Sequence, residues 1–269
     1  MASAKFKFKM LRFAAIGEPL LHPCISEMIS YASEKKIADS IDVLTNAALL
    51  TERMSCELIK AGLSILRVSL QGLSSEEYKA NCGVDVKFEV IKENVAYYFK
   101  NCGESRVYVK IIDYMLKGSQ EREKMFYDIF SPISHIAAIE HLTPTVNGIN
   151  FKKIADETEL LLTQDGNKMK RINVCPQPFY MMQINPDGNI TACCSVKYPG
   201  IFGHVNTGAA AAWNGKPLTE FRKKSLLSGS ARASEACSEC ALHHYSISEE
   251  DILDGYEDEI LKRMETNHL

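Results

Sequence analysis

The chain has no long apolar run, no excess of charge of one sign and no apolar leader segment. None of its 269 residues lies in an apolar stretch as long as a membrane-crossing helix needs, and no signal peptide opens the chain. The formal net charge is −3 and the charged residues are dispersed, which gives no indication of attraction to nucleic acid or to an anionic membrane. We therefore expect a cytoplasmic protein with no nucleic-acid partner and no membrane partner.

Cysteine, in contrast, is abundant, because the chain has nine. A reducing compartment argues against disulfides and in favour of metal binding or buried thiols. Four of the cysteines have no ligand-like spacing, and we expect them to be packing residues or surface thiols: Cys24, Cys56, Cys82 and Cys102. The other five lie between positions 175 and 240.

Residues 175–194, CPQPFYMMQINPDGNITACC, predict a short hairpin with cysteine at both ends. The strands are expected at 181–184 and 189–192. Between them, Pro186 fixes its own φ and Gly188 can take a positive φ, so the sequence Asn-Pro-Asp-Gly predicts the turn.

Four of these cysteines have the pattern of a metal site. The hairpin brings Cys175 toward Cys193, and a C-x-x-C pair follows at Cys237 and Cys240. Thiolates are ligands of both structural zinc and iron–sulfur clusters, so the spacing alone leaves both open. Because neighbouring residues of a strand face opposite ways, only one of Cys193 and Cys194 is expected to reach the metal.

The first 150 residues alternate apolar strands with amphipathic helices. The strands are expected at residues 11–16, 41–45, 64–71, 106–113 and 135–142. Thr51 and Ser119 are expected to cap two of the intervening helices at their N-termini. This alternation predicts right-handed βαβ units and a parallel sheet.

Two of these strands are polar on one face. Arg67, Ser69 and Gln71 share a face of the third strand, and Tyr108 and Lys110 share a face of the fourth. One polar face predicts a curved or partial barrel whose lumen holds a polar ligand. Four ionisable residues at or near this face are candidates for a catalytic acid or base: Lys110, Arg67, Glu140 and His141. For each of them, a role in a structural ion pair or in a cofactor contact is the better interpretation.

Several polar groups follow the predicted strands at one edge of the sheet. Gly17, Glu18 and Pro19 come after the first strand, Thr45-Asn46 ends the second, and Ser69 ends the third. Glycine and proline mark turns everywhere, so the tripeptide alone predicts only a strand-to-helix turn. Together, a carboxylate, an amide and two hydroxyls suit an amino acid or a ribose as ligand.

These segments resemble the radical SAM (S-adenosylmethionine) enzymes. IGEPLLHP, LTNAALL and RVSLQG are similar to the core of that family. CPQPFYMMQINPDGNITACC followed by C-x-x-C is similar to its C-terminal auxiliary-cluster domain, of the SPASM type or the shortened twitch type. Cys175, Gly188 and Cys193 meet the pattern C-x12-G-x4-C. One C-x-x-C with no later cysteine resembles the single-cluster twitch form, of the 2-deoxy-scyllo-inosamine dehydrogenase type.

The resemblance implies a set of site residues. The methionine amino group of SAM would be held by Gly17, Glu18 and Pro19. The ribose or carboxylate of SAM would lie near Thr45, Asn46 and Ser69. An auxiliary [4Fe–4S] cluster, with zinc as the alternative, would be bound by Cys175, Cys193, Cys237 and Cys240. The Gly-x4-Cys spacing favours Cys193 over Cys194.

The chain departs from the family at three points. Ala47 stands where glycine usually follows Thr-Asn, and Ser195 stands where an acidic residue is common after Cys-Cys. In the family, a C-x3-C-x2-C loop upstream of Gly-Glu-Pro binds the cluster that SAM chelates. The 16 residues before Gly17 contain no cysteine. We therefore expect a barrel that is truncated at its N-terminus and inactive as written.

The predicted architecture is α/β. It comprises a partial radical SAM (β/α) barrel over residues 10–150, a linker over 151–174, a SPASM/twitch iron–sulfur domain over 175–247 and a C-terminal helix over 248–269. The resemblance implies a radical SAM oxidoreductase or maturase. Such an enzyme uses a 5′-deoxyadenosyl radical to oxidise a sugar-like alcohol or a peptide side chain, with an electron donor such as flavodoxin or ferredoxin. The alternative is a non-catalytic Fe–S or zinc module that acts as a partner or electron carrier.

Overall fold

The computed structural model describes residues 7–14, 17–83, 85–145, 149–154, 159–245 and 248–266. The chain forms two compact units, one of residues 2–141 and one of residues 142–269. The boundaries predicted from the sequence, a barrel to residue 150 and a linker over 151–174, stay predictions. Residues 142–174 lie within the second compact unit.

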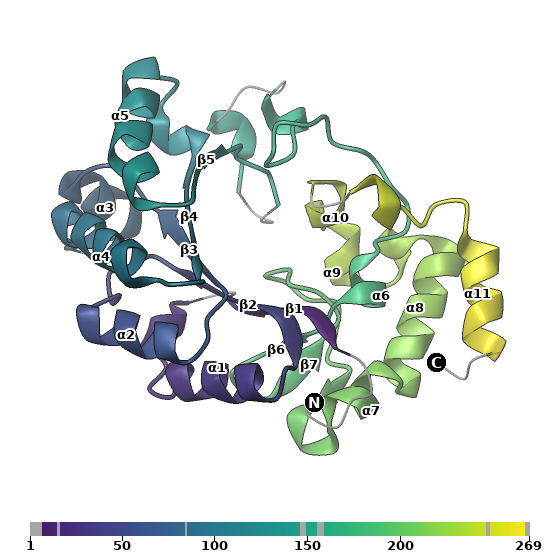
Figure 1. The fold of residues 1–269 in the computed structure, drawn as a ribbon. Coiled ribbons are helices and arrows are strands. Elements are labelled where there is room, and N and C mark those ends of the chain that lie inside the picture. Colours follow the sequence, from purple (N-terminus) through teal and green to yellow (C-terminus); the bar gives the residue numbers. More distant parts are fainter. Residues whose placement is uncertain are drawn as a thin grey trace. The chain divides into compact units, whose positions relative to one another are not determined.

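Strands and helices alternate along the first unit. In chain order they are β1 (Phe8–Phe13), η1 (Pro19–Leu21), α1 (Ile25–Glu34), β2 (Ala38–Thr45), α2 (Glu52–Lys60), β3 (Ile65–Leu70), α3 (Ser75–Cys82), α4 (Phe88–Asn101), β4 (Arg106–Ile112), η2 (Asp113–Leu116), α5 (Gln120–Phe130), η3 (Ser131–Ile133) and β5 (Ile136–Glu140). The strands form one parallel sheet in the order β1-β2-β3-β4-β5. Helices α1, α2, α4 and α5 lie along one of its faces (Figure 1). The predicted partial-barrel class is confirmed, and the described strands do not close into a barrel.

Side-chain alternation decides which face of the sheet carries the core. Leu66 and Val68 of β3 are fully buried against the helices, whereas Arg67 between them is only half-buried on the other face. The same core includes Val107 and Val109 of β4. Burial of each such side chain stabilises the fold by about 1.5 to 3 kcal/mol. One face is therefore an apolar core and the other a polar lumen, as the sequence predicted.

The helix starts were partly predictable. Thr51 Oγ1 accepts a hydrogen bond from the Met54 N–H at 3.2 Å, and Ser119 Oγ accepts one from the Arg122 N–H at 3.4 Å, so both predicted caps are confirmed. Helix α3 was not predicted. Only Tyr78 of this helix is buried, so its sequence carries almost no apolar periodicity.

The first strand lies earlier in the chain than predicted. The apolar run 11–16 suggested a strand there, but β1 is Phe8–Phe13. The pairing of Phe8 with Ala38 of β2 accounts for this earlier start. Ile16, the last residue of the predicted strand, lies outside the described residues.

The second unit consists of short elements. They are η4 (Phe151–Lys153), η5 (Glu159–Leu161), α6 (Gln177–Tyr180), β6 (Gln183–Ile184), β7 (Asn189–Thr191), β8 (Gly203–His204), η6 (Val205–Thr207), α7 (Ala209–Trp213), α8 (Lys216–Ser228), η7 (Ser230–Arg232), α9 (Glu235–Ser238), α10 (Leu242–Tyr245), η8 (Glu249–Asp251) and α11 (Glu257–Thr266). The predicted hairpin is confirmed as the antiparallel pair β6–β7. A third strand, β8, pairs with β7 and was not predicted.

The C-terminal segment is not the single helix that was predicted over 248–269. Among its described residues, a 3-10 turn at Glu249–Asp251 is followed by a break and then by α11. Gly255, which lies two residues before α11, has φ +93°, a conformation that does not fit within a helix, and its N–H donates to Glu257 Oε2 at 2.8 Å. A continuous acidic, amphipathic pattern therefore concealed a glycine-based break.

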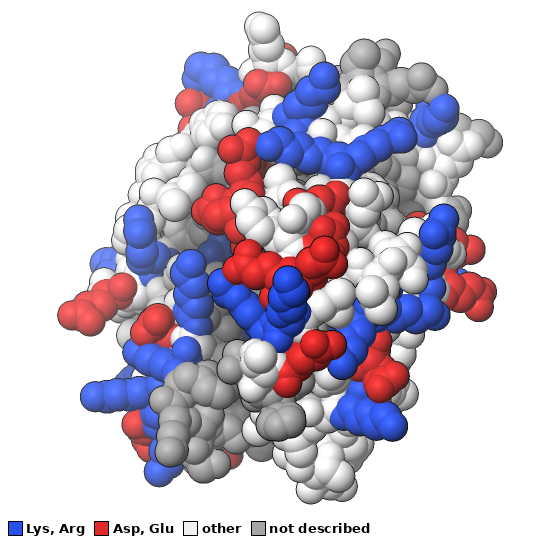
Figure 2. All heavy atoms as spheres, turned by 90° about the vertical axis from the view of Figure 1, so that its right-hand side faces the viewer, with Lys and Arg blue, Asp and Glu red and all other residues white. Residues whose placement is uncertain are grey.

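The charged side chains are interspersed over the surface that Figure 2 presents, with acidic and basic groups side by side. None of the helices among the described residues combines the length and the apolar character that a membrane crossing requires.

Candidate metal centre

The hairpin turn depends on Gly188. Its N–H donates to the Asn185 carbonyl at 2.9 Å, and the Asn185 N–H donates to the Asn189 carbonyl at 2.9 Å. Gly188 has φ +83°, and a Cβ there would lie 2.6 Å from His204 Nε2. Glycine is thus required both by conformation and by space, and the turn directs β7 toward Cys193.

Cys175 is held in place by a buried serine. The Cys175 N–H donates to Ser230 Oγ at 2.7 Å, and the Ser230 N–H donates to the Asn173 carbonyl at 2.8 Å. Ser230 is only 2% exposed. The backbone before Cys175 is therefore fixed to the segment that precedes α9.

The C-x-x-C pair lies on the short helix α9 and the turn that follows it. Ser234 Oγ accepts a hydrogen bond from the Cys237 N–H at 3.2 Å and so caps the helix. The Cys240 N–H donates to the Cys237 carbonyl at 3.2 Å. This turn brings the C-x-x-C cysteines to the same side.

All four predicted ligands line one small cavity, of about 30 Å³. They come from three separate places in the chain: the segment before α6, the end of the hairpin, and the C-x-x-C turn. The buried side chains of Ser230 and His243 line the same cavity. Cys194, in contrast, is exposed, does not line the cavity, and has its Sγ 3.9 Å from Gln177 Oε1.

Burial keeps the thiols of Cys175, Cys193 and Cys237 protonated when no cation is bound. Burial, together with the nearby thiols of Cys193, Cys240 and Cys237, raises the pKa of Cys175 to about 12. Burial likewise raises the pKa of Cys193 to about 12 and also raises that of Cys237. A positive metal group bound by these thiols would displace their protons, because thiolates are the ligating form.

Four thiolates can hold either a single zinc ion or an iron–sulfur cluster. Four thiolates around a single zinc have sulfur atoms about 3.8 Å apart, since each Zn–S bond is about 2.3 Å. Among the described residues, no group of three or more His, Cys, Asp or Glu side chains is arranged to hold a metal ion. The four thiols that line the cavity are the ligand type of both zinc and an iron–sulfur cluster.

Three residues of the predicted SAM site hold the edge of the first unit's sheet together. Glu18 Oε1 accepts from the Leu20 N–H at 3.0 Å, and its Oε2 accepts from the Asn46 N–H at 2.8 Å. Thr45 Oγ1 accepts from the Ala47 N–H at 3.0 Å. Asn46 Oδ1 accepts from the N–H of Ala48 at 2.9 Å. The Glu18 carboxylate thus joins the loop after β1 to the end of β2.

Ala47 takes a conformation that glycine prefers. Its φ is +62° and it is fully buried. Asn94 Nδ2 donates to the Ala47 carbonyl at 2.9 Å, which holds the loop in place. The glycine usual at this position in the family is explained by this φ, and alanine adopts it here at a conformational cost.

The lumen face carries a buried carboxylate that the sequence analysis missed. Asp42 is fully buried and accepts hydrogen bonds from Arg67 Nε at 2.8 Å, Arg12 Nη2 at 3.3 Å and Ser40 Oγ at 2.5 Å. The Arg67 guanidinium lies over the Tyr108 ring, 5.2 Å from its centroid. The sequence feature that could have revealed it is an aspartate between two apolar residues, Ile41 and Val43, of a predicted strand.

The predicted acid and base candidates are all paired. Lys110 Nζ donates to Glu140 Oε2 at 2.5 Å, and the Tyr108 hydroxyl donates to Glu140 Oε1 at 2.9 Å. His141 Nδ1 lies 2.7 Å from Asp113 Oδ2. Arg67 pairs with Asp42, as described above. The structure therefore brings Lys110 and Glu140 together in the lumen and places His141 with the loop after β4.

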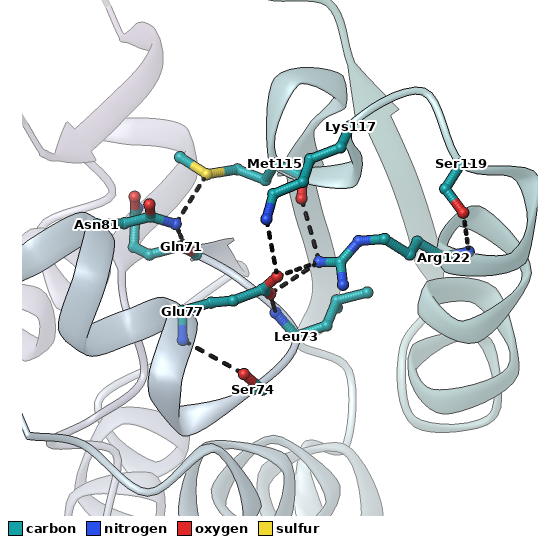
Figure 3. A network of polar contacts seen from close by, with 9 residues as sticks. All are labelled: Gln71, Leu73, Ser74, Glu77, Asn81, Met115, Lys117, Ser119 and Arg122. Atoms are coloured by element: carbon teal, nitrogen blue, oxygen red, sulfur yellow. Dashed lines mark hydrogen bonds and ion pairs between the residues drawn. The ribbon is translucent and has the colours of Figure 1, made fainter.

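A second polar network joins the loops that follow β3 and β4 (Figure 3). Glu77 accepts from the Leu73 N–H at 2.7 Å, and Arg122 Nη2 donates to both carboxylate oxygens of Glu77, at 2.6 and 2.8 Å. Burial alone raises the pKa of Glu77, but the Leu73 N–H and the Arg122 and Lys117 charges outweigh it and leave the pKa lowered. This network fixes the edge of the sheet where the predicted ligand residues lie.

Comparison with known proteins identifies the C-terminal segment. The family model of SPASM, an iron–sulfur cluster-binding domain, matches residues 175–241. A stretch of 94 residues, 34% of this chain, is 31% identical to the tungsten-containing aldehyde ferredoxin oxidoreductase cofactor-modifying protein of Pyrococcus furiosus and covers 26% of it. A stretch of 70 residues, 26% of this chain, is 36% identical to the GTP 3′,8-cyclase of Chlorobaculum tepidum and covers 21% of it. The matches thus span about a quarter of these relatives' length or less.

The fold has a counterpart among solved structures. The crystal structure of BtrN in complex with AdoMet and 2-DOIA matches 86% of this chain and 72% of its own, with a TM-score of 0.50 and 15% identity. At this identity the likeness concerns the fold. Together with the SPASM match, it confirms the predicted resemblance to radical SAM proteins that carry a C-terminal SPASM domain.

Proposed function

Starting from the SPASM match, we propose that Cys175, Cys193, Cys237 and Cys240 bind one [4Fe–4S] cluster. The observation that carries the proposal is that these four thiols, from three separate places in the chain, line a single cavity. Four cysteines are the usual ligand set of such a cluster.

The surrounding residues fit this role. Ser230 and Ser234 fix the backbone of Cys175 and Cys237 through hydrogen bonds, so the thiols are positioned before anything binds. Phe221 and Pro178 line the same cavity and limit the access of water. The bound cluster would supply one-electron transfer.

For the whole chain we propose a radical SAM-type function, of the oxidoreductase or maturase class. The fold and the polar groups at the sheet edge support it. SAM would lie against Gly17, Glu18, Pro19, Thr45, Asn46 and Ser69. Because the Glu18 carboxylate already accepts two backbone N–H groups, its role is to shape this edge. In the described part of the chain, no residue forms a hydrogen bond with the Ser69 hydroxyl, which leaves that group for the ligand.

No residue of this chain is assigned to the cluster that SAM chelates. The 269 residues contain no C-x3-C-x2-C pattern. We therefore derive no radical-forming step from these residues.

The lumen supports a polar substrate, a sugar-like alcohol or a peptide side chain. Lys110 and Arg67 are 21% and 23% exposed at their side chains, so both charges are accessible in part while they stay paired. The auxiliary cluster would take one electron in a two-electron oxidation of that substrate. An electron donor such as flavodoxin or ferredoxin would be the protein partner.

The first experiment measures iron, sulfide and zinc per chain on protein purified and reconstituted without oxygen. We expect about four irons and four sulfides per chain. One zinc without sulfide would instead identify the four thiolates as a structural zinc site.

Single cysteine variants test the ligand set. Cys175→Ala, Cys193→Ala, Cys237→Ala and Cys240→Ala should each lose cluster iron. Cys194→Ala is the matched control, because this exposed thiol is next to Cys193 but outside the cavity. An unchanged iron content in Cys193→Ala together with loss in Cys194→Ala would contradict the assignment.

A second candidate is a non-catalytic iron–sulfur module that acts as a partner or electron carrier. The four thiols that line one cavity would serve this function without any residue of the first unit. The two functions differ in one measurement, the reductive cleavage of SAM to methionine and 5′-deoxyadenosine. A chain extended upstream with a C-x3-C-x2-C loop should cleave SAM if the enzyme proposal holds, and should not if the carrier proposal holds.

A further inference from the structure

One residue in the thiol cavity has no part in the proposed ligand set. His243 lines the same cavity as the four thiols and is only 7% exposed. It follows Cys240 by three positions and lies on the short helix α10. Among the residues that line this cavity, His243 is the only one with an aromatic N–H group.

The neighbours of His243 fix its position. The His244 ring lies against it, with 3.9 Å between ring centroids. His244 Nδ1 accepts a hydrogen bond from the Ile172 N–H at 3.3 Å, and the Tyr245 hydroxyl donates to the Leu160 carbonyl at 2.7 Å. Helix α10 is thereby held at two consecutive residues, which leaves the imidazole little freedom to turn away from the cavity.

The hydrogen-bonding capacity of His243 is not used within the chain. Among the described residues, none forms a hydrogen bond with either ring nitrogen of His243. Burial, followed by the nearby His244, lowers the pKa of His243 to about 4, so the ring is neutral near pH 7 and carries a single N–H. Because His243 lines the cavity and its ring has no hydrogen-bond partner among the described residues, its N–H is available to a sulfur atom bound there.

We propose that His243 donates its imidazole N–H to a sulfur atom of the cluster or of a ligating thiolate and thereby raises the reduction potential of the cluster. This inference rests on the proposed cluster at the four thiols. Reduction adds negative charge to the cluster, and a hydrogen bond to its sulfur atoms stabilises that added charge. His243 would thus act as a hydrogen-bond donor that tunes the reduction potential, rather than as a fifth ligand.

The test is a set of variants in the full chain, reconstituted without oxygen, with the midpoint potential measured by redox titration monitored by electron paramagnetic resonance. His243→Phe keeps an aromatic ring and removes the donor, so we expect a more negative midpoint potential at unchanged iron and sulfide content. His243→Asn and His243→Gln place an amide N–H near the two ring positions, and one of them should recover part of the shift. His243→Leu is a second donor-free variant of smaller volume, for use if the phenyl ring does not fit.

The control is His244→Asn, whose amide oxygen replaces the acceptor of the Ile172 N–H. It should have the wild-type potential. An unchanged potential in both His243→Phe and His243→Leu overturns the inference while the proposed cluster stands. Loss of cluster iron in the donor-free variants, with retention in wild type, also overturns it, because His243 would then be a ligand. A wild-type chain without iron and sulfide defeats the proposed cluster itself.

Discussion

The two units of the chain are stabilised in different ways. In the unit of residues 2–141, the described residues form one continuous apolar core between the sheet and its helices. In the unit of residues 142–269, they form two small clusters, one around Leu218 and Phe221 and one around Val174 and Leu226. Because apolar burial is the main stabilising free energy of a domain, the second unit has much less of it to rely on.

The buried polar groups of the two units also differ in how they are paired. In the lumen of the first unit, Asp42 and Glu140 accept hydrogen bonds from arginine, lysine, serine or tyrosine of the same unit. In the second unit, Cys175 and Cys193 are buried against other thiols, each of which raises the pKa of its neighbours. The first arrangement pairs opposite charges within the chain, whereas the second gathers thiols whose ligating, deprotonated form requires a bound positive group.

The largest expected effect is therefore that of metal removal on the second unit. Structural zinc sites in small domains contribute on the order of 10 kcal/mol to folding, and we expect the proposed cluster to contribute a comparable amount. We expect chelation of the cluster iron to remove the hydrogen-exchange protection of β6, β7 and α8, and to leave that of β2, β3 and β4 intact. Exchange measured by mass spectrometry on the holo and the iron-depleted chain checks this. Equal protection of the second unit in both states would show that its own packing is sufficient.

The reverse case is a change that affects only the first unit. Asp42→Asn removes the charge that faces Arg67 and Arg12 and leaves those cations without their carboxylate, so we expect a loss of about 3 to 5 kcal/mol in the free energy of unfolding. Urea denaturation monitored by circular dichroism measures it. Asp39→Asn is the control, because Asp39 pairs with Lys7 at the surface, where such pairs contribute about 1 kcal/mol or less. Iron content should be unchanged in both variants, and a loss of iron in Asp42→Asn would show that the units are not independent.

The hairpin gives a smaller effect that connects folding to the metal site. Gly188→Ala combines a positive φ with a Cβ 2.6 Å from His204 Nε2, and we expect it to cost about 2 to 4 kcal/mol. Gly83→Ala at the end of α3 also has a positive φ, of +67°, but its Cβ would meet nothing within 4 Å, so about 1 kcal/mol is expected there. Only Gly188→Ala should lower the iron content, since β7 leads to Cys193. Equal destabilisation by the two variants would mean that the contact with His204 relaxes.

Much of the fold was predictable because local patterns and tertiary packing agree. Leu66 and Val68 alternate with Arg67, and both the sheet and its polar lumen follow from that period of two. Helix caps such as Thr51 could be predicted because a single hydroxyl that accepts a backbone N–H favours a helix start at that residue. The break at Gly255 was not, since an acidic, amphipathic run looks the same with and without it. Helix α3 was missed because its position is fixed by the tertiary contacts of Glu77 rather than by an apolar face.

The candidate site likewise contains residues that the sequence predicted and residues that it did not. Cysteine spacing was sufficient to choose the four residues that line the cavity, because a C-x-x-C turn and a hairpin are local structures. The pairing of Asp42 with Arg67 joins strands 25 positions apart in the sequence, and no pattern in either strand specifies the other. The place of His243 in the cavity likewise depends on its anchoring to Ile172 and Leu160 through its neighbours. Long-range polar contacts of this kind required the structure.

The smallest predicted effect is a pH dependence confined to the first unit. Burial alone would raise the pKa of Glu77 in the folded state. The hydrogen bonds from the Leu73 N–H and Arg122, with the charge of Arg122, outweigh it, so the pKa is lowered. Its contribution to stability is therefore fully present above the unfolded-state pKa of about 4.5 and is lost as the pH falls through the lower folded-state value. Glu77→Gln should be less stable than wild type at pH 7, and the difference should shrink as the pH falls below about 4. Urea denaturation at a series of pH values measures this, with Glu93→Gln, an exposed residue of α4, as control. A difference that stays constant down to pH 3 would mean that Glu77 acts through its shape and its neutral hydrogen bonds, and the charge of Arg122 would then contribute nothing to holding the loops after β3 and β4 together.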